Sequence, residues 1–99
     1  MDEEVLATRL AEVLSRYKAE PAYRRLVVRV KELGENQRDE TLQARELQRA
    51  CRDLPALGRE LAAIGFGDVA AMDFRHVTAE SGRLVQAFNR LIEERRLTF

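Results

Sequence analysis

Residues 3–23, EEVLATRLAEVLSRYKAEPAY, contain the signals that decide the fold class. Their large apolar side chains recur at the three- and four-residue steps of one helix face. Asp2 is a candidate N-cap, and the carboxylates of Glu3 and Glu4 suit the positive end of a helix. Proline disfavours helical geometry at the residue before it and is well placed in a first turn, so Pro21 predicts a corner between a helix over residues 3–18 and a second helix. The stripe consists of Val5, Leu6, Leu10, Val13, Leu14 and Tyr17.

The second segment has an apolar stripe of Tyr23, Leu26, Val27, Val30 and Leu33. Residues 34–40 then contain no large hydrophobic side chain, and two interpretations are open. In one, Gly34 ends the helix and Asp39 or Thr41 caps a new one. In the other, which we favour, one weakly broken helix runs on to Asp53, because the apolar line continues beyond the polar stretch. The continuation consists of Ala44, Leu47, Cys51 and Leu54.

Pro55 marks the next boundary and predicts a short helix over residues 56–64. Its apolar face consists of Leu57, Leu61 and Ile64. Gly65 predicts a left-handed stop at its C-terminus, with Phe66 packing back over the last turn in a Schellman arrangement.

For residues 69–77 two structures are open, a helix or an extended segment. Their apolar residues alternate as in a strand, but the sequence offers no second strand with which such a strand could pair. Asp68 is a candidate cap for this stretch, and Thr78 for the final helix. Gly82 lies within that helix at a cost of about 1 kcal/mol relative to alanine, which indicates close packing or simple tolerance. The final stripe consists of Leu84, Val85, Phe88, Leu91 and Ile92.

Together these signals predict one all-α domain over residues 1–99, with three to five helices forming a helical hairpin or small bundle that dimerises. The length of 99 residues allows one domain, and 45% hydrophobic with 34% charged residues is a globular balance. The formal net charge of +0 provides no global field for nucleic acid or anionic lipid. The acidic start and the lack of a long apolar run predict no signal peptide, no membrane contact and a cytoplasmic location.

Few residues are candidates for catalysis or metal binding. His76 is the only histidine and Cys51 the only cysteine, so neither an internal disulfide nor a clustered metal-ligand spacing exists. The candidate nucleophiles Ser15, Ser81 and Cys51 stand outside any nucleophile motif. We therefore expect a surface or helix-packing His76, a Cys51 buried as a small hydrophobe, no enzymatic activity, no cofactor and no small-molecule substrate. An enzyme built around His76 and Cys51 is the competing interpretation.

Arginine supplies 15 of the 17 basic residues, and its guanidinium makes bidentate contacts with carboxylates and phosphates. A nucleic-acid interface is one hypothesis, built from Arg24, Arg25, Arg29, Arg45 and Arg49. Nearby acidic side chains favour solvated faces of mixed charge, and no aromatic residues interleave with the arginines for base stacking. These acidic residues are Glu20, Glu32, Glu46 and Asp53.

All four phenylalanines fall in the last third of the chain. That concentration of bulky apolar surface predicts an interface with a second subunit or another protein, with an ordinary intrachain core as the alternative. The predicted interface consists of Phe66, Met72, Phe74, Leu84, Val85, Phe88, Leu91 and Ile92. The function predicted from these features is a non-enzymatic interaction or adaptor module, a regulatory subunit that acts through apolar helix faces in a homodimer or small hetero-complex. A small nucleic-acid-binding helical protein is the alternative.

Two patches resemble the YlbF/YmcA family of small helical bacterial regulatory proteins. Residues 10–23, LAEVLSRYKAEPAY, are similar to that family's opening helix, short corner and tyrosine at the start of a long helix. Residues 74–92, FRHVTAESGRLVQAFNRLI, resemble its last helix. The patches cover about a third of the chain. The resemblance implies a dimerising, non-catalytic cytoplasmic adaptor in a regulatory complex that influences RNA processing. The chain departs from that family in having no C-terminal cysteine, so we do not expect the iron–sulfur ligation that some members show.

Overall fold

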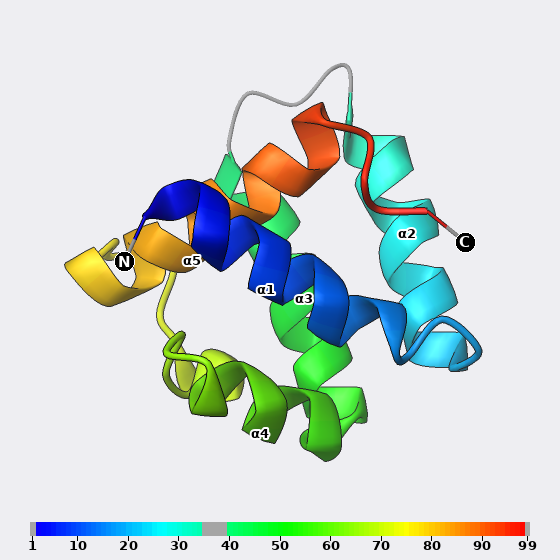
Figure 1. Cartoon of the computed structure of the whole chain (residues 1–99), viewed down its shortest axis with the longest axis horizontal. Coiled ribbons are helices and arrows are strands. Elements are labelled where there is room, and N and C mark those ends of the chain that lie inside the picture. Colours follow the sequence, from blue (N-terminus) through cyan, green and yellow to red (C-terminus); the bar gives the residue numbers. More distant parts are fainter. Residues whose placement is uncertain (1, 35–39, 99) are drawn as a thin grey trace.

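A computed structural model describes residues 2–34 and 40–98, and within these ranges the chain forms five α-helices, one short 3-10 turn and no strand (Figure 1). This confirms the predicted all-α bundle. The elements are α1 (Glu3–Ser15), α2 (Pro21–Gly34), α3 (Glu40–Asp53), α4 (Pro55–Ala63), η1 (Val69–Ala71) and α5 (Ala79–Glu93).

At the start of the chain, the predicted cap at Asp2 and the predicted boundary at Pro21 are confirmed, whereas the predicted end of the first helix is not. The Asp2 side chain accepts a hydrogen bond from the backbone N of Glu4 at 3.2 Å and so caps α1. α1 ends at Ser15 rather than at Lys18, because the following residues form hydrogen-bonded turns instead of a continuing helix. Pro21 is the first residue of α2, as expected from its fixed backbone angle.

The favoured prediction of one long helix through residue 53 is wrong. α2 ends at Gly34, α3 begins at Glu40, and the two helices pack side by side (Figure 1). Folding back brings two apolar stripes into one core, so that both Val27 and Leu47 are fully buried, whereas one straight helix would leave a single long stripe to be covered. Thr41 lies inside α3 and is not its cap. The candidate cap Asp39 lies outside the described residues.

The end of α4 follows the predicted Schellman arrangement. Gly65 has φ of +106°, a region that L side chains rarely adopt. The backbone N of Phe66 donates to Leu61 O at 3.0 Å, and the Phe66 side chain is fully buried. Pro55 is the first residue of this helix, as predicted.

Residues 69–77 are neither a regular helix nor a strand. They begin with the three-residue turn η1, and Asp68 makes no side-chain cap hydrogen bond to it, so the predicted Asp68 cap is wrong. Thr78 does cap α5, because its Oγ1 accepts from the backbone N of Ser81 at 3.2 Å while Ser81 Oγ accepts from the backbone N of Thr78 at 2.8 Å. A Cβ added at Gly82 would make only an ordinary contact with a neighbouring side chain, which indicates tolerance rather than close packing.

Helix α3 lies at the centre of the packing. It contacts α2, α4, α5 and η1, while α1 packs on α5 and α4. Gln48 of α3 is buried, and its Nε2 donates to Val69 O at 3.0 Å and to Met72 O at 2.7 Å, with a longer contact to Ala70 O. Arg52 Nε donates to Ala70 O at 3.0 Å. These side chains supply hydrogen bonds to the carbonyls of a segment with little regular backbone pairing.

We expect Gln48→Ala to lower the free energy of unfolding by about 2–3 kcal/mol, because it removes two good hydrogen bonds and leaves backbone carbonyls without partners. Urea unfolding followed by circular dichroism measures the change. Gln86→Ala, at an exposed glutamine of α5, is the matched control and should change stability by no more than about 0.5 kcal/mol. Equal effects of the two substitutions would contradict the proposed role of Gln48.

Candidate functional site

A groove runs between α2 and α3, with a volume of about 290 Å³. Alanines at positions 22 and 50 leave the groove between the two helices unfilled, because a single methyl group occupies little space. Charged side chains of both helices form its walls. The residues of this α2–α3 groove are Ala22, Arg25, Leu26, Arg29, Glu46, Arg49, Ala50 and Asp53.

Two ion pairs cross the α2–α3 groove. Arg25 Nη2 lies 3.2 Å from Asp53 Oδ2, and Arg29 Nε lies 3.7 Å from Glu46 Oε1. All but the Glu46 side chain are well exposed, so each pair contributes at most a small part of the folding free energy. The sequence correctly indicated mixed charge on these faces and pairing within a helix, because Arg29 Nη1 also lies 3.6 Å from Glu32 Oε2 of α2. It did not indicate the two pairs between the helices.

Arg49 lies on the α3 wall of the groove, between the two carboxylates in the sequence of the helix. Its side chain is exposed and makes no ion pair with any residue in the described ranges. The groove therefore holds three guanidiniums against two carboxylates, an excess of one positive charge. Such a guanidinium can donate two parallel hydrogen bonds to one carboxylate or phosphate group.

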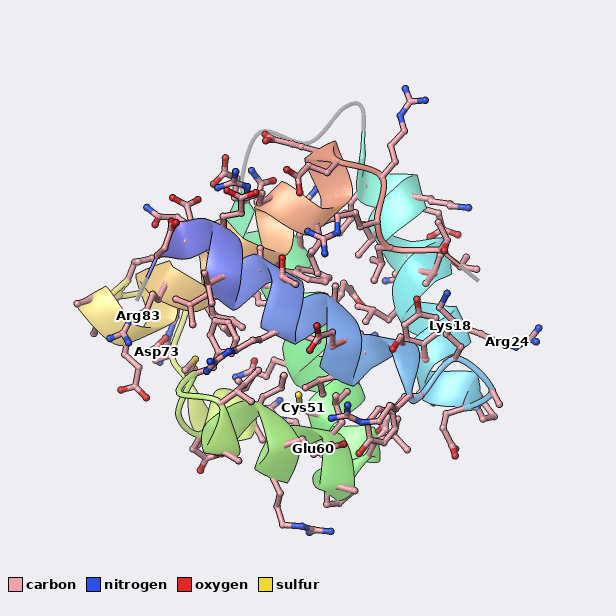
Figure 2. All side chains as sticks on the ribbon, in the orientation of Figure 1. Lys18, Arg24, Cys51, Glu60, Asp73 and Arg83 are labelled. Atoms are coloured by element: carbon pink, nitrogen blue, oxygen red, sulfur yellow. The ribbon has the colours of Figure 1, made fainter. Side chains whose placement is uncertain are left out.

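The groove brings together three of the five arginines singled out for nucleic-acid binding. Arg25, Arg29 and Arg49 line it, whereas Arg24 and Arg45 do not. Arg24 points outward from α2 at the edge of the molecule (Figure 2). The five arginines thus do not form one continuous basic face. What the sequence could not reveal is that α2 and α3 face each other, which is what creates the groove.

The residues predicted to form a partner interface lie mostly in the core of this chain. Six of the eight are buried, with at most 7% of their surface exposed, and only Met72 and Ile92 are half-buried. The alternative interpretation, an intrachain core, accounts for those six side chains. The six are Phe66, Phe74, Leu84, Val85, Phe88 and Leu91.

His76 is exposed and lines a second hollow of about 390 Å³ beside the start of α5, together with Asp73, Glu80 and Ser81 among others. The Ser81 hydroxyl is engaged in the cap of α5. Cys51 does not line this hollow. Among the described residues, no three His, Cys, Asp or Glu side chains are arranged to bind a metal ion. His76 is thus a surface residue, as expected.

Cys51 is buried in the centre of the bundle, with 2% of its surface exposed. Burial raises the pKa of its thiol to about 12, and the charge of Asp68 adds to the rise. The thiol is therefore protonated at neutral pH and acts as a small hydrophobe, which confirms the prediction from the sequence.

No protein-family model, curated protein or solved structure matches this chain. The resemblance to the YlbF/YmcA family stays a prediction from two sequence patches. No helix in the described ranges is long and apolar enough to cross a lipid bilayer.

We expect the Cys51 thiol to be inert toward the disulfide reagent DTNB at pH 8 in the folded protein. With a pKa of about 12, roughly one thiol in ten thousand is ionised at that pH, and burial excludes the reagent. In guanidinium chloride the same thiol should react within minutes, followed by absorbance at 412 nm. Rapid labelling of the native protein at the denatured rate would contradict the burial of Cys51.

Proposed function

We propose that the protein is a non-enzymatic interaction module that binds a protein partner in the α2–α3 groove. The observation that carries this proposal is the groove itself, in which three exposed arginine side chains stand over small buried side chains at Ala22 and Ala50. Protein interfaces are enriched in arginine, and an arginine flanked by packed apolar surface is a frequent centre of binding energy. The apolar faces of the described helices are largely used by the chain's own core, so charged side chains dominate the accessible surface of the groove.

A protein partner fits the groove better than a nucleic acid does. Asp53 and Glu46 stand beside Arg25 and Arg29, and they would repel the phosphates of a nucleic-acid backbone. The residues that line the groove include no aromatic side chain on which a base could stack. The second candidate, a small nucleic-acid binder, is supported by the meeting of three arginines in one groove.

The proposal also includes the adaptor role. A regulatory adaptor in a homodimer or small hetero-complex, as the YlbF/YmcA resemblance implies, needs a recognition surface but no catalytic group. Of the three candidate nucleophiles, Cys51 is buried, Ser81 is engaged in the α5 cap, and the Ser15 hydroxyl donates to Glu12 O at 2.7 Å. These contacts support a non-enzymatic role.

A photo-crosslinking amino acid at position 49 tests the proposed function in the organism that carries this chain. We expect a protein crosslink at position 49 that resists ribonuclease and deoxyribonuclease. The matched control is position 83 on α5, which lies on the other side of the molecule from the groove (Figure 2). Equal crosslinking at positions 49 and 83, or a product removed by nuclease, would contradict the proposed partner or surface.

Salt dependence separates the two candidate functions in vitro. We expect a 20-nucleotide single-stranded RNA to bind no more tightly than about 10⁻⁴ M at physiological salt, the weak end of non-specific binding. Fluorescence anisotropy across a salt series measures this affinity. Tighter binding that falls steeply with salt, and that is lost when Arg25, Arg29 and Arg49 are all changed to glutamine, would favour the nucleic-acid binder.

A further inference from the structure

We propose, resting on the function proposed above, that the partner protein presents an acidic segment to three arginines on the outer face of α3. These residues, Arg45, Arg49 and Arg52, are called the α3 arginine stripe, and Arg49 joins the stripe to the α2–α3 groove. Each guanidinium of the stripe can donate hydrogen bonds to one carboxylate of the segment.

The three arginines lie in one row along α3. They follow one another at steps of four and three residues, which places side chains on the same face of a helix. At a rise of about 1.5 Å per residue, the row is about 10 Å long. All three residues are exposed, so a short segment of a partner can reach them together.

The positive charge of the α3 arginine stripe is not balanced by its neighbours. None of its guanidiniums forms an ion pair with a carboxylate in the described ranges. Arg52 Nε donates to Ala70 O, but a carbonyl is neutral and leaves the charge of the guanidinium uncompensated. The carboxylates on the adjoining flank of α3, Glu46 and Asp53, already lie against arginines of α2.

The stripe does not serve the stability of the helix. Like charges at steps of three and four residues repel each other and destabilise a helix. The chain as a whole has 17 basic and 17 acidic residues, so three uncompensated arginines in a row are a local feature and not the result of a basic composition. Charge complementarity therefore favours an occupant that brings several carboxylates.

An acidic protein segment fits the stripe better than a nucleic acid does. Glu46 and Asp53 border the stripe on the side of the groove, where they would repel the phosphate that each nucleotide carries. A polypeptide can place carboxylates over the arginines and neutral side chains beside the two acids. Residues 40–53 also include no aromatic side chain on which a base could stack.

The segment belongs to another protein rather than to a second copy of this chain. Acidic side chains of this chain gather around a hollow of about 490 Å³ beside the starts of α1 and α3 and the end of α5. Asn89 Nδ2 donates to Glu40 at 3.2 Å and to Glu93 at 3.1 Å. Arg90 Nε lies 3.3 Å from Glu94 Oε2. These carboxylates are engaged within their own chain, which makes them poor partners for the arginines of another copy.

The experiment is a selection from a displayed library of random 12-residue peptides on the full chain. We expect the enriched peptides to carry at least two Asp or Glu residues and a net negative charge. Arg45→Gln combined with Arg49→Gln, the stripe variant, should weaken their binding at least tenfold in fluorescence anisotropy. Rising salt should weaken their binding to the wild type, because the contacts are exposed and charged.

Arg9→Gln combined with Arg83→Gln is the matched control. It removes the same amount of charge from two exposed arginines of α1 and α5 that lie outside the stripe, and it should change the affinity less than threefold. Circular dichroism and urea unfolding confirm that each variant is folded. We expect the stripe variant to be at least as stable as the wild type, because the substitutions relieve repulsion between like charges.

Three results of the binding experiments would overturn the proposal: no enrichment of acidic peptides, acidic peptides that bind the stripe variant as tightly as the control variant, or a 20-nucleotide RNA that binds more tightly than the peptides and loses its affinity in the stripe variant. Self-association of the wild type that is lost in the stripe variant, measured by sedimentation, would identify a second copy as the occupant and would also overturn it.

The proposed function fails on a different result. A nuclease-resistant protein crosslink at position 49 in the cell, without enrichment of acidic peptides, would overturn the acidic segment and leave the interaction module standing. Enriched acidic peptides without any cellular crosslink would overturn the proposed function instead.

Discussion

The burial of α3 is the constraint on which the rest of the structure depends. This helix is rich in polar residues, yet it packs against three helices, α2, α4 and α5, and against the 3-10 turn η1. Its central position is possible because small or apolar side chains at Ala44, Leu47 and Cys51 face the core, while the Gln48 amide satisfies backbone carbonyls of the segment that crosses it. Without these hydrogen bonds, the irregular segment would bury unpaired polar groups against the helix.

The same helix connects the fold to the proposed function. Its inner face holds the core, and its outer face carries Glu46, Arg49 and Asp53 into the α2–α3 groove. Because the inner face of α3 is packed in the core, the backbone that carries these side chains is already ordered before a partner binds. The ion pairs of the groove are largely exposed and weak, so a partner can rearrange them at little expense to the stability of the fold.

Local chemical signals allowed most helix boundaries to be predicted. These signals act on the backbone within a few residues, so their effect can be recognised from the sequence alone. They are Asp2, Pro21, Pro55, Gly65 and Thr78. The break between α2 and α3 at Gly34 was one of two interpretations and not the favoured one, because a polar interruption in an apolar line is compatible with both a straight helix and a reversal.

The site was harder to predict than the helices, because its contacts join residues far apart in the chain. An arginine on α2 and an aspartate on α3 form a pair only after the reversal, and periodicity within a helix carries no information about it. A glutamine such as Gln48 is typical of an exposed helix face, so its burial was not expected. The apolar stripe of α5 was legible, but a stripe that packs on its own chain and one that packs on a partner have the same sequence pattern.

Native-state hydrogen exchange tests most directly whether α3 holds this structure together. The account predicts that the backbone amides of residues 47–51 exchange only through global unfolding, with the same denaturant dependence as the whole protein, while the ends of α1 and α5 exchange through local fraying. Exchange of the α3 amides through a smaller opening, with α1 and α5 still protected, would contradict it.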